Sequence, residues 1–250
     1  MAIVWRDKLL AFGVHFIATA LLAAAAATVI FGVWFPSPFN EMIGGTKLFE
    51  LVVGCDLALG PLISLVIFNR GKSRRELVLD YTVVGILQVA ALSYGVWVMA
   101  ASRPVYVAFS TDRFEVVMAQ NVDAADLAAG PPQYRRLPLT APLLVAVDVP
   151  PKDRSDVLFR ELAGHGGYTQ PKYFVPYESM LGEIRKHAGT IAALEKSHPE
   201  ARGLLEAAIA DSGLPEERLR WLPVAVKGEF WTALIDENGK PVKYAQLDPY

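Results

Sequence analysis

Two polar features interrupt the apolar stretch at residues 50–69, and they are the first candidates for chemistry in this sequence. Asp56 stands well inside the stretch, and Gly60 and Pro61 follow it by four and five residues. An ionised aspartate at the centre of a membrane-spanning helix costs about 2.5–3.5 kcal/mol on insertion scales. A proline removes a backbone donor and leaves the carbonyl of Leu57 without its helical partner. We therefore expect Asp56 to face other helices, to be paired or to be protonated.

Groups arranged for catalysis are scarce in the rest of the chain. There is no GxSxG elbow, no phosphate-binding glycine loop and no HExxH motif, and the four histidines are scattered. The single cysteine, Cys55, excludes an intrachain disulfide and a zinc site built on paired thiolates. We predict a protein that is not an enzyme, with no catalytic residue, no metal ligand and no cofactor.

The most distinctive segment of the C-terminal part is "GHGGYTQPKYFVPY", residues 164–177. Its glycines and aromatic residues could shape a small catalytic site, form a structural loop, or present a surface to a partner protein. The last two readings are favoured over catalysis. As a partner surface, the segment offers His165, Tyr168, Gln170, Tyr173 and Tyr177.

Three apolar segments, at about 9–35, 48–68 and 77–101, must position the polar residues of the first hundred positions. Each covers about 20 residues or more, enough to cross a hydrocarbon core of about 30 Å as a helix. Hydrophobic residues make up 53% of the 250 residues. A cleaved signal peptide is the alternative for the first segment, but its apolar run continues to Phe35 and is too long for an ordinary signal. We predict a membrane domain over residues 1–103.

The basic residues predict the orientation of these helices. They gather before the first segment and between the second and third, whereas the loop between the first two carries only Lys47; they are Arg6, Lys8, Arg70, Lys72, Arg74 and Arg75. This bias places the N-terminus in the cytoplasm and everything after Ala101 outside it, in the periplasm of a Gram-negative cell. The net charge of −2 argues against a nucleic-acid partner.

Polar side chains at the depth of Asp56 are its expected neighbours. A rise of about 1.5 Å per residue, counted from the predicted cytoplasmic ends, puts Gln88, Ser93 and the adjacent Tyr94 near that level. Thr19 also lies near it, whereas His15 lies closer to the cytoplasmic side. We expect a candidate intramembrane site of Asp56, Gly60, Pro61, Gln88, Ser93 and Tyr94.

The C-terminal part, residues 104–250, is predicted to be an α+β domain with antiparallel strands. Residues 105–119 read as a hairpin, 143–149 as a strand, and the end of the chain as a second hairpin that turns at Asn238 and Gly239. Helical spacing occupies residues 150–164, 177–197 and 199–213.

Several motifs in order resemble the TfpX/TfpZ family of type IV pilin accessory proteins. They are "FGVHFIATALL", "GCDLALGPLISLVIFN", the basic loop, "ALSYG" and "RPVYVAF", and the resemblance is closest over the first 120 residues. "QPKYFVPYE" and "DENGKPVKYAQLDP" fit more loosely. The resemblance implies an inner-membrane, chaperone-like protein that binds one major pilin, itself anchored by a membrane helix, and promotes its stability or assembly. The implied partners are that pilin and membrane lipid.

Other functions and other roles for Asp56 stay open at this stage. The protein could be an envelope enzyme that modifies pilin, or a sensor of a periplasmic signal. Asp56 could join a polar knot that locks three helices together, line a docking groove for the membrane helix of the pilin, or belong to an ion pathway.

Overall fold

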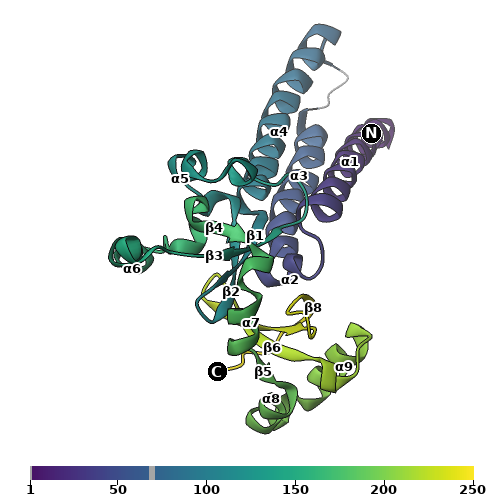
Figure 1. Cartoon of the computed structure of the whole chain (residues 1–250). Coiled ribbons are helices and arrows are strands. Elements are labelled where there is room, and N and C mark those ends of the chain that lie inside the picture. Colours follow the sequence, from purple (N-terminus) through teal and green to yellow (C-terminus); the bar gives the residue numbers. More distant parts are fainter. Residues whose placement is uncertain (1, 68–70) are drawn as a thin grey trace. The chain divides into compact units, whose positions relative to one another are not determined.

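Three long helices account for the apolar first hundred residues (Figure 1). The computed structural model describes residues 2–67 and 71–250. Helices α1 (Ala2–Val29), α3 (Gly45–Ile67) and α4 (Arg74–Ser102) are long and apolar enough to cross a membrane, which confirms the prediction of three such helices. Each begins three to seven residues before its predicted start, and α1 continues as a π-helical turn, η1 (Ile30–Trp34). Residue 68, where the second segment was predicted to end, and Arg70 lie outside the described residues.

Large apolar side chains are exposed along all three long helices. Leu10 is 68% exposed, Val66 81% and Ile86 64%. A helix that is apolar all round suits either a large core or a lipid environment. Because these side chains are not covered by the chain itself, the second environment fits them.

The chain divides into two compact units. The helical unit contains the residues up to Pro36 together with Gly44–Ala101, and the sheet unit contains Ser37–Ile43 together with Ser102–Tyr250. In sequence, Ser37–Ile43 joins two of the long helices, and the predicted membrane domain of residues 1–103 includes it. In the structure this segment packs within the sheet unit. There the ring of Phe39 lies 5.6 Å from that of Tyr244, measured between centroids. Lys227 Nζ also donates to the Ile43 carbonyl at 3.1 Å.

The sheet unit has a mixed sheet in the order β4-β3-β1-β2-β6-β7-β8, with β5 paired to β6. The strands are β1 (Pro104–Ser110), β2 (Arg113–Met118), β3 (Leu143–Val147), β4 (Phe174–Pro176), β5 (Gly189–Thr190), β6 (Arg220–Val226), β7 (Glu229–Ile235) and β8 (Pro241–Ala245). The helices are α2 (Phe39–Ile43), α5 (Ala124–Ala129), α6 (Arg154–Leu162), α7 (Leu181–His187), α8 (Ile191–Ser197) and α9 (Arg202–Ser212). Several 3₁₀ turns connect them (Figure 1).

The prediction of purely antiparallel strands is wrong, because two of the pairings are parallel. Strand β1 pairs with β3 and β2 pairs with β6 in parallel, while the hairpins β1-β2, β6-β7 and β7-β8 are antiparallel. A hairpin is specified by its local turn, whereas a parallel neighbour arrives over a long connection. Both predicted hairpins are confirmed.

Strand pairing divides the helical segment predicted at 177–197. Helix α7 ends at His187, and Gly189 and Thr190 form β5 opposite Trp221 and Arg220. A side chain at Gly189 would overlap the indole of Trp221. The close approach of the two strands therefore requires a glycine at this position and separates α7 from α8.

Two apolar clusters form part of the core of the sheet unit. One centres on β1, β3 and the segment before β4, and includes Tyr106, Val145 and Phe174. The other lies between α8, α9 and the last strands, and includes Leu194 and Leu205. Together they fix the loops and helices on which a partner could act.

Candidate functional site

One side chain from each long helix meets in a hydrogen-bonded cluster within the helical unit. His15 of α1 lies with its Nδ1 2.5 Å from Ser64 Oγ of α3, and with its Nε2 2.6 Å from Gln88 Oε1 of α4. A neutral imidazole with the proton on Nε2 satisfies both contacts: Nε2–H donates to Gln88 and Nδ1 accepts from the Ser64 hydroxyl. We call these three residues the polar knot.

Gly60 makes room for the polar knot. Gly60 and Pro61 are buried in α3, and a Cβ atom at Gly60 would overlap the amide of Gln88 and lie 3.3 Å from His15 Nε2. The predicted residues Gly60 and Gln88 therefore do meet. The purpose of the glycine is to let the Gln88 side chain approach the α3 backbone and reach His15.

Asp56 lies beside the polar knot without bonding to it. Its half-buried side chain lines a cavity of about 200 Å³ together with His15, Thr19 and Gln88. Within the described part of the chain, no hydrogen bond or ion pair joins this carboxylate to another side chain. The carboxylate is thus available to a group that enters the cavity.

Ser93 and Tyr94, two of the predicted neighbours of Asp56, are not part of this site. His15, which was predicted to lie closer to the cytoplasmic side, does belong to it. Ser93 is exposed, and Tyr94 is 66% exposed and packs beside Trp97 at 5.8 Å between ring centroids. His15 belongs to the knot because α1 begins at Ala2, so the residue lies about 20 Å along the helix, about twice the depth counted from a start at Leu9. Ser64 was not singled out, although its position in an apolar helix is the signal that could have identified it.

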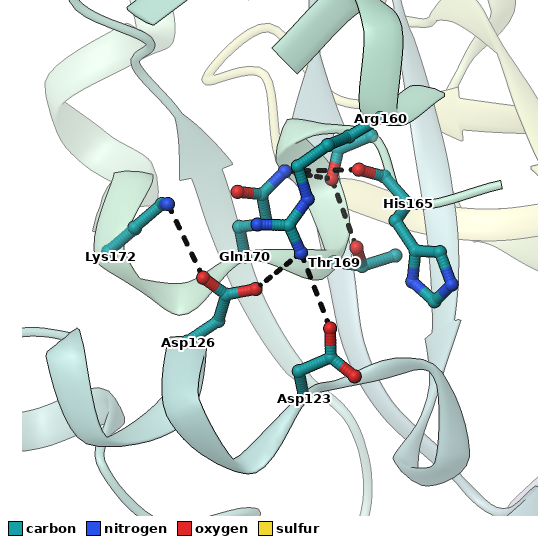
Figure 2. Close-up of polar contacts among 8 residues, drawn as sticks. Asp123, Asp126, Arg160, His165, Thr169, Gln170 and Lys172 are labelled. Atoms are coloured by element: carbon teal, nitrogen blue, oxygen red, sulfur yellow. Dashed lines mark hydrogen bonds and ion pairs between the residues drawn. The ribbon is translucent and has the colours of Figure 1, made fainter. Parts of the chain in front are cut away.

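The distinctive segment at 164–177 is mainly a structural loop (Figure 2). Gln170 is fully buried, and its Nε2 donates to the carbonyls of His165 at 3.0 Å and Gly166 at 3.3 Å. Tyr173 and Tyr177 are also buried, and the Tyr177 hydroxyl donates to the Gly239 carbonyl.

The expectation of a five-residue partner surface in this segment changes accordingly. Gln170, Tyr173 and Tyr177 hold the domain together and expose too little to contact a partner. Only His165 and Tyr168 keep partial exposure. Burial, with a smaller effect from the charge of Glu115, raises the pKa of the Tyr168 hydroxyl, so this residue remains a neutral hydrogen-bonding group.

A charged cluster beside this loop joins α5 to α6 (Figure 2). The buried Asp126 receives a hydrogen bond from Arg160 at 2.7 Å and lies 3.4 Å from Lys172 Nζ, while Arg160 also reaches Asp123 at 3.3 Å. Burial alone would raise the pKa of the Asp126 carboxyl, but Arg160 and Lys172 outweigh it and hold that pKa below its usual value. The cluster fixes α6 against α5 and offers no paired acid and base.

A groove of about 660 Å³ lies within the sheet unit. Its lining includes Phe39 of α2, Asp211 of α9, and Lys243 and Tyr244 of β8. Two of the charged groups of its wall, Lys243 and Asp211, pair at 2.7 Å. Among the described residues, no group of three or more His, Cys, Asp or Glu side chains could hold a metal ion.

The architecture is that of a protein with three apolar helices, each long enough to cross a membrane, followed by a mixed-sheet domain. Comparison with known proteins makes the class specific, since the family described as "Fimbrial assembly protein FimB" matches residues 3–44. The fimbrial assembly protein of serogroups C1 and C2 from Dichelobacter nodosus is 34% identical over 105 residues, covering 42% of this chain and 80% of that relative. This chain belongs to the fimbrial assembly protein family.

The similarity to other relatives extends over both units. The serogroup I fimbrial assembly protein of Dichelobacter nodosus is 28% identical over 242 residues, which cover 95% of this chain and 94% of the relative. The serogroup E1 protein is 27% identical over the same shares of both chains. No solved structure matches this chain. The expected resemblance to pilus assembly proteins is confirmed as a class, and the finer TfpX/TfpZ assignment stays a prediction.

Proposed function

We propose that this protein is an inner-membrane accessory factor of type IV fimbrial assembly, which binds its cognate major pilin and promotes its stability or its incorporation into fimbriae. The observation that carries the proposal is the similarity to proteins named as fimbrial assembly proteins across 95% of the chain. Because the match includes both units, the function of the relatives is expected to need both. A client with a membrane helix and an external head, as the TfpX/TfpZ resemblance implies, would have a contact for each unit.

The membrane orientation in this proposal has the sheet unit in the periplasm. Basic residues flank α1 and α3 on the opposite side: Arg6 and Lys8 at the start of α1, and Lys72, Arg74 and Arg75 after α3. The packing of Ser37–Ile43 within the sheet unit agrees with three spans, in either orientation. That segment links α1 to α3, so it and the sheet unit must lie on the same side of the membrane.

The proposed mode of action is binding and not catalysis. In the polar knot both imidazole nitrogens of His15 are already in hydrogen bonds. The charged cluster around Asp126 pairs its carboxylate with two cations. In the polar knot the Ser64 hydroxyl does lie beside the His15 imidazole, but Ser64 is buried in α3 and out of reach of a substrate. Asp56 and the exposed surfaces of the sheet unit are instead open to a partner.

Deletion of the gene, followed by complementation, tests the proposed function. We expect the deletion strain to contain less major pilin or fewer surface fimbriae, and the full-length protein to restore both. The second measurement is in-cell crosslinking, in which the restored protein should be joined to pilin and should co-purify with it from detergent. Unchanged pilin and unchanged fimbriae in the deletion strain would contradict the proposal.

A further inference from the structure

Helix α6 presents its apolar side chains to solvent. Leu158, Phe159 and Leu162 are 60%, 70% and 82% exposed, whereas Val157 is the buried side chain of this helix. Amphipathic surface helices normally turn their apolar face to the core. Here the arrangement is reversed, and the exposed face needs another explanation than core packing.

The three exposed side chains form a continuous surface, which we call the α6 stripe. With about 100° of rotation per residue, Leu158, Leu162 and Phe159 fall within a sector about 100° wide, and Val157 lies outside it. Leu162 follows Phe159 by three residues and Leu158 by four, and both spacings occur among the anchor side chains of a helix that inserts into a groove. In Figure 1, α6 lies at the outer end of the segment that follows β3, and the exposure of the three side chains shows that the rest of the chain leaves them open.

The rest of the sheet unit holds α6 in this orientation. On its inner side Arg160 is bound to the buried Asp126, as Figure 2 shows, and Val157 packs in the core cluster around β1 and β3. At its end Gly164, with φ +84°, and the bond from the His165 amide to the Arg160 carbonyl stop the helix. A recognition element held in this way loses little conformational entropy on binding.

The size of the α6 stripe indicates what can cover it. Three large side chains at these exposures present roughly 400 Å², within the range of the largest apolar patch on a monomer, which is often functional. A standard interface buries about 800 Å² per partner. Two copies meeting through this stripe alone would therefore bury only about half of what a stable dimer needs.

The charges around the stripe argue against a lipid surface. Lys152, Arg154, Asp153, Asp156 and Glu161 flank it, so the rim carries both signs. Helices that lie on membranes have a polar face rich in lysine and arginine. A polar rim of mixed charge around an apolar centre is instead the pattern of a protein–protein interface.

We propose that the α6 stripe docks into an apolar groove on the periplasmic head of the fimbrial subunit. This inference rests on the proposed function and names the surface that performs it. A contact of this size is weak between free molecules. It becomes effective when both proteins are held in one membrane, because a second contact there raises their effective concentration. Phe159 is the central anchor, since aromatic side chains supply much of the energy of such contacts.

The test is photo-crosslinking of the full-length protein in cells that make the cognate pilin. The photoreactive residue p-benzoylphenylalanine replaces Phe159, Leu162 or, as a control on the exposed face of α8, Lys196. We expect adducts with the pilin from positions 159 and 162 and not from 196.

Phe159→Ser should leave the abundance of the protein unchanged and lower the pilin that co-purifies by about 10-fold, as loss of an anchor of about 1.4 kcal/mol predicts. Leu204→Ser, which changes an exposed leucine of α9, should leave co-purification unchanged.

Each other outcome overturns a stated part of the inference. Adducts between two copies of this chain would make the stripe a self-association surface, and adducts with lipid would make it a membrane contact. Co-purification of pilin without any adduct from the stripe would refute this surface and leave the proposed function intact. Failure of the unmodified protein to co-purify with pilin would refute the proposed function itself.

Discussion

The amide of Gln88 on α4 lies directly against the α-carbon of Gly60 on α3, leaving no space for a methyl group between them. This approach lets Gln88 Oε1 accept a hydrogen bond from His15 on α1. The distance between α3 and α4 thus depends on Gly60. The hydrogen bond between Gln88 and His15 of α1 depends in turn on that distance.

Gly60→Ala should destabilise the helical unit by about 1–3 kcal/mol, because the added methyl group overlaps Gln88 and breaks its bond to His15. The measurements are abundance in membranes and thermal unfolding in detergent. Gly54→Ala is the matched control in the same helix, since nothing lies within 4 Å of the added carbon. Equal effects of the two variants would show that the packing at Gly60 is not special.

Asp56→Leu should leave the abundance of the protein intact and reduce fimbriation. The carboxylate lines a cavity beside the polar knot and takes part in no hydrogen bond within the described chain, so the knot holds the helices without it. Asp56→Asn keeps a hydrogen-bonding group at the same place and should be tolerated better. The measurements are immunoblotting of membranes and counts of surface fimbriae.

A loss of abundance in Asp56→Leu would place the residue in the structural knot instead. If Asp56→Leu shows both normal abundance and normal fimbriation, Asp56 neither supports the polar knot nor contacts a partner.

The sequence predicted what depends on local pattern. The hairpin of β1 and β2 follows from two β-rich runs around a polar turn, and that of β7 and β8 from a turn in which Gly239 has φ +80°. The turn between β6 and β7 was not recognised because it uses Lys227 at φ +52°, a conformation that a lysine rarely adopts. The parallel pairing of β1 with β3 depends on a connection with no local signature.

The candidate sites were harder to predict, because burial is decided by distant parts of the chain. Gln170 and Tyr173 look like surface residues in a glycine-rich loop, yet both are buried. The Gln170 amide donates to two carbonyls of this loop, those of His165 and Gly166. The α6 stripe could not be predicted either. Its apolar side chains look like core residues, but an amphipathic pattern does not say which face of the helix meets the core.

Glu115 on β2 should make the stability of the sheet unit depend on pH. Burial raises its pKa to about 7, and Arg113, 4.0 Å away, opposes this shift only in part. An unfolded glutamate releases its proton near pH 4.3. Stability from this group is therefore full below about pH 4 and is lost as the pH rises toward 7.

Glu115→Gln should accordingly be more stable than the natural protein at pH 8, by about 1–3 kcal/mol, and similar to it at pH 4.5. Unfolding of the full-length protein in detergent, followed by tryptophan fluorescence at both pH values, measures the difference. The exposed Glu200→Gln is the control and should change neither value. A Glu115→Gln effect of the same size at both pH values would show that ionisation is not its cause.

Reporter fusions test the membrane orientation. Alkaline phosphatase fused after Tyr250 should be active, and green fluorescent protein at the same position should be dark, because the basic residues around α1 and α3 predict a C-terminus outside the cytoplasm. A reporter inserted at residues 37–43 would disturb a packed segment, so the C-terminal fusion is the better choice. The opposite pair of signals would reverse the orientation.

The choice of one pilin over another should reside in the sheet unit. The helical unit exposes apolar side chains that would suit many membrane helices, whereas the sheet unit carries varied loops and the α6 stripe on a rigid frame. Binding residues concentrate on such positions. Exchanging residues 103–250 between this protein and a relative such as the serogroup I protein should transfer the preference for pilin, as measured by crosslinking in cells that express either pilin. The matched control exchanges residues 1–102 and should leave the preference unchanged. If the preference follows residues 1–102, recognition lies in the membrane helices and the cavity beside Asp56 becomes the principal site of contact.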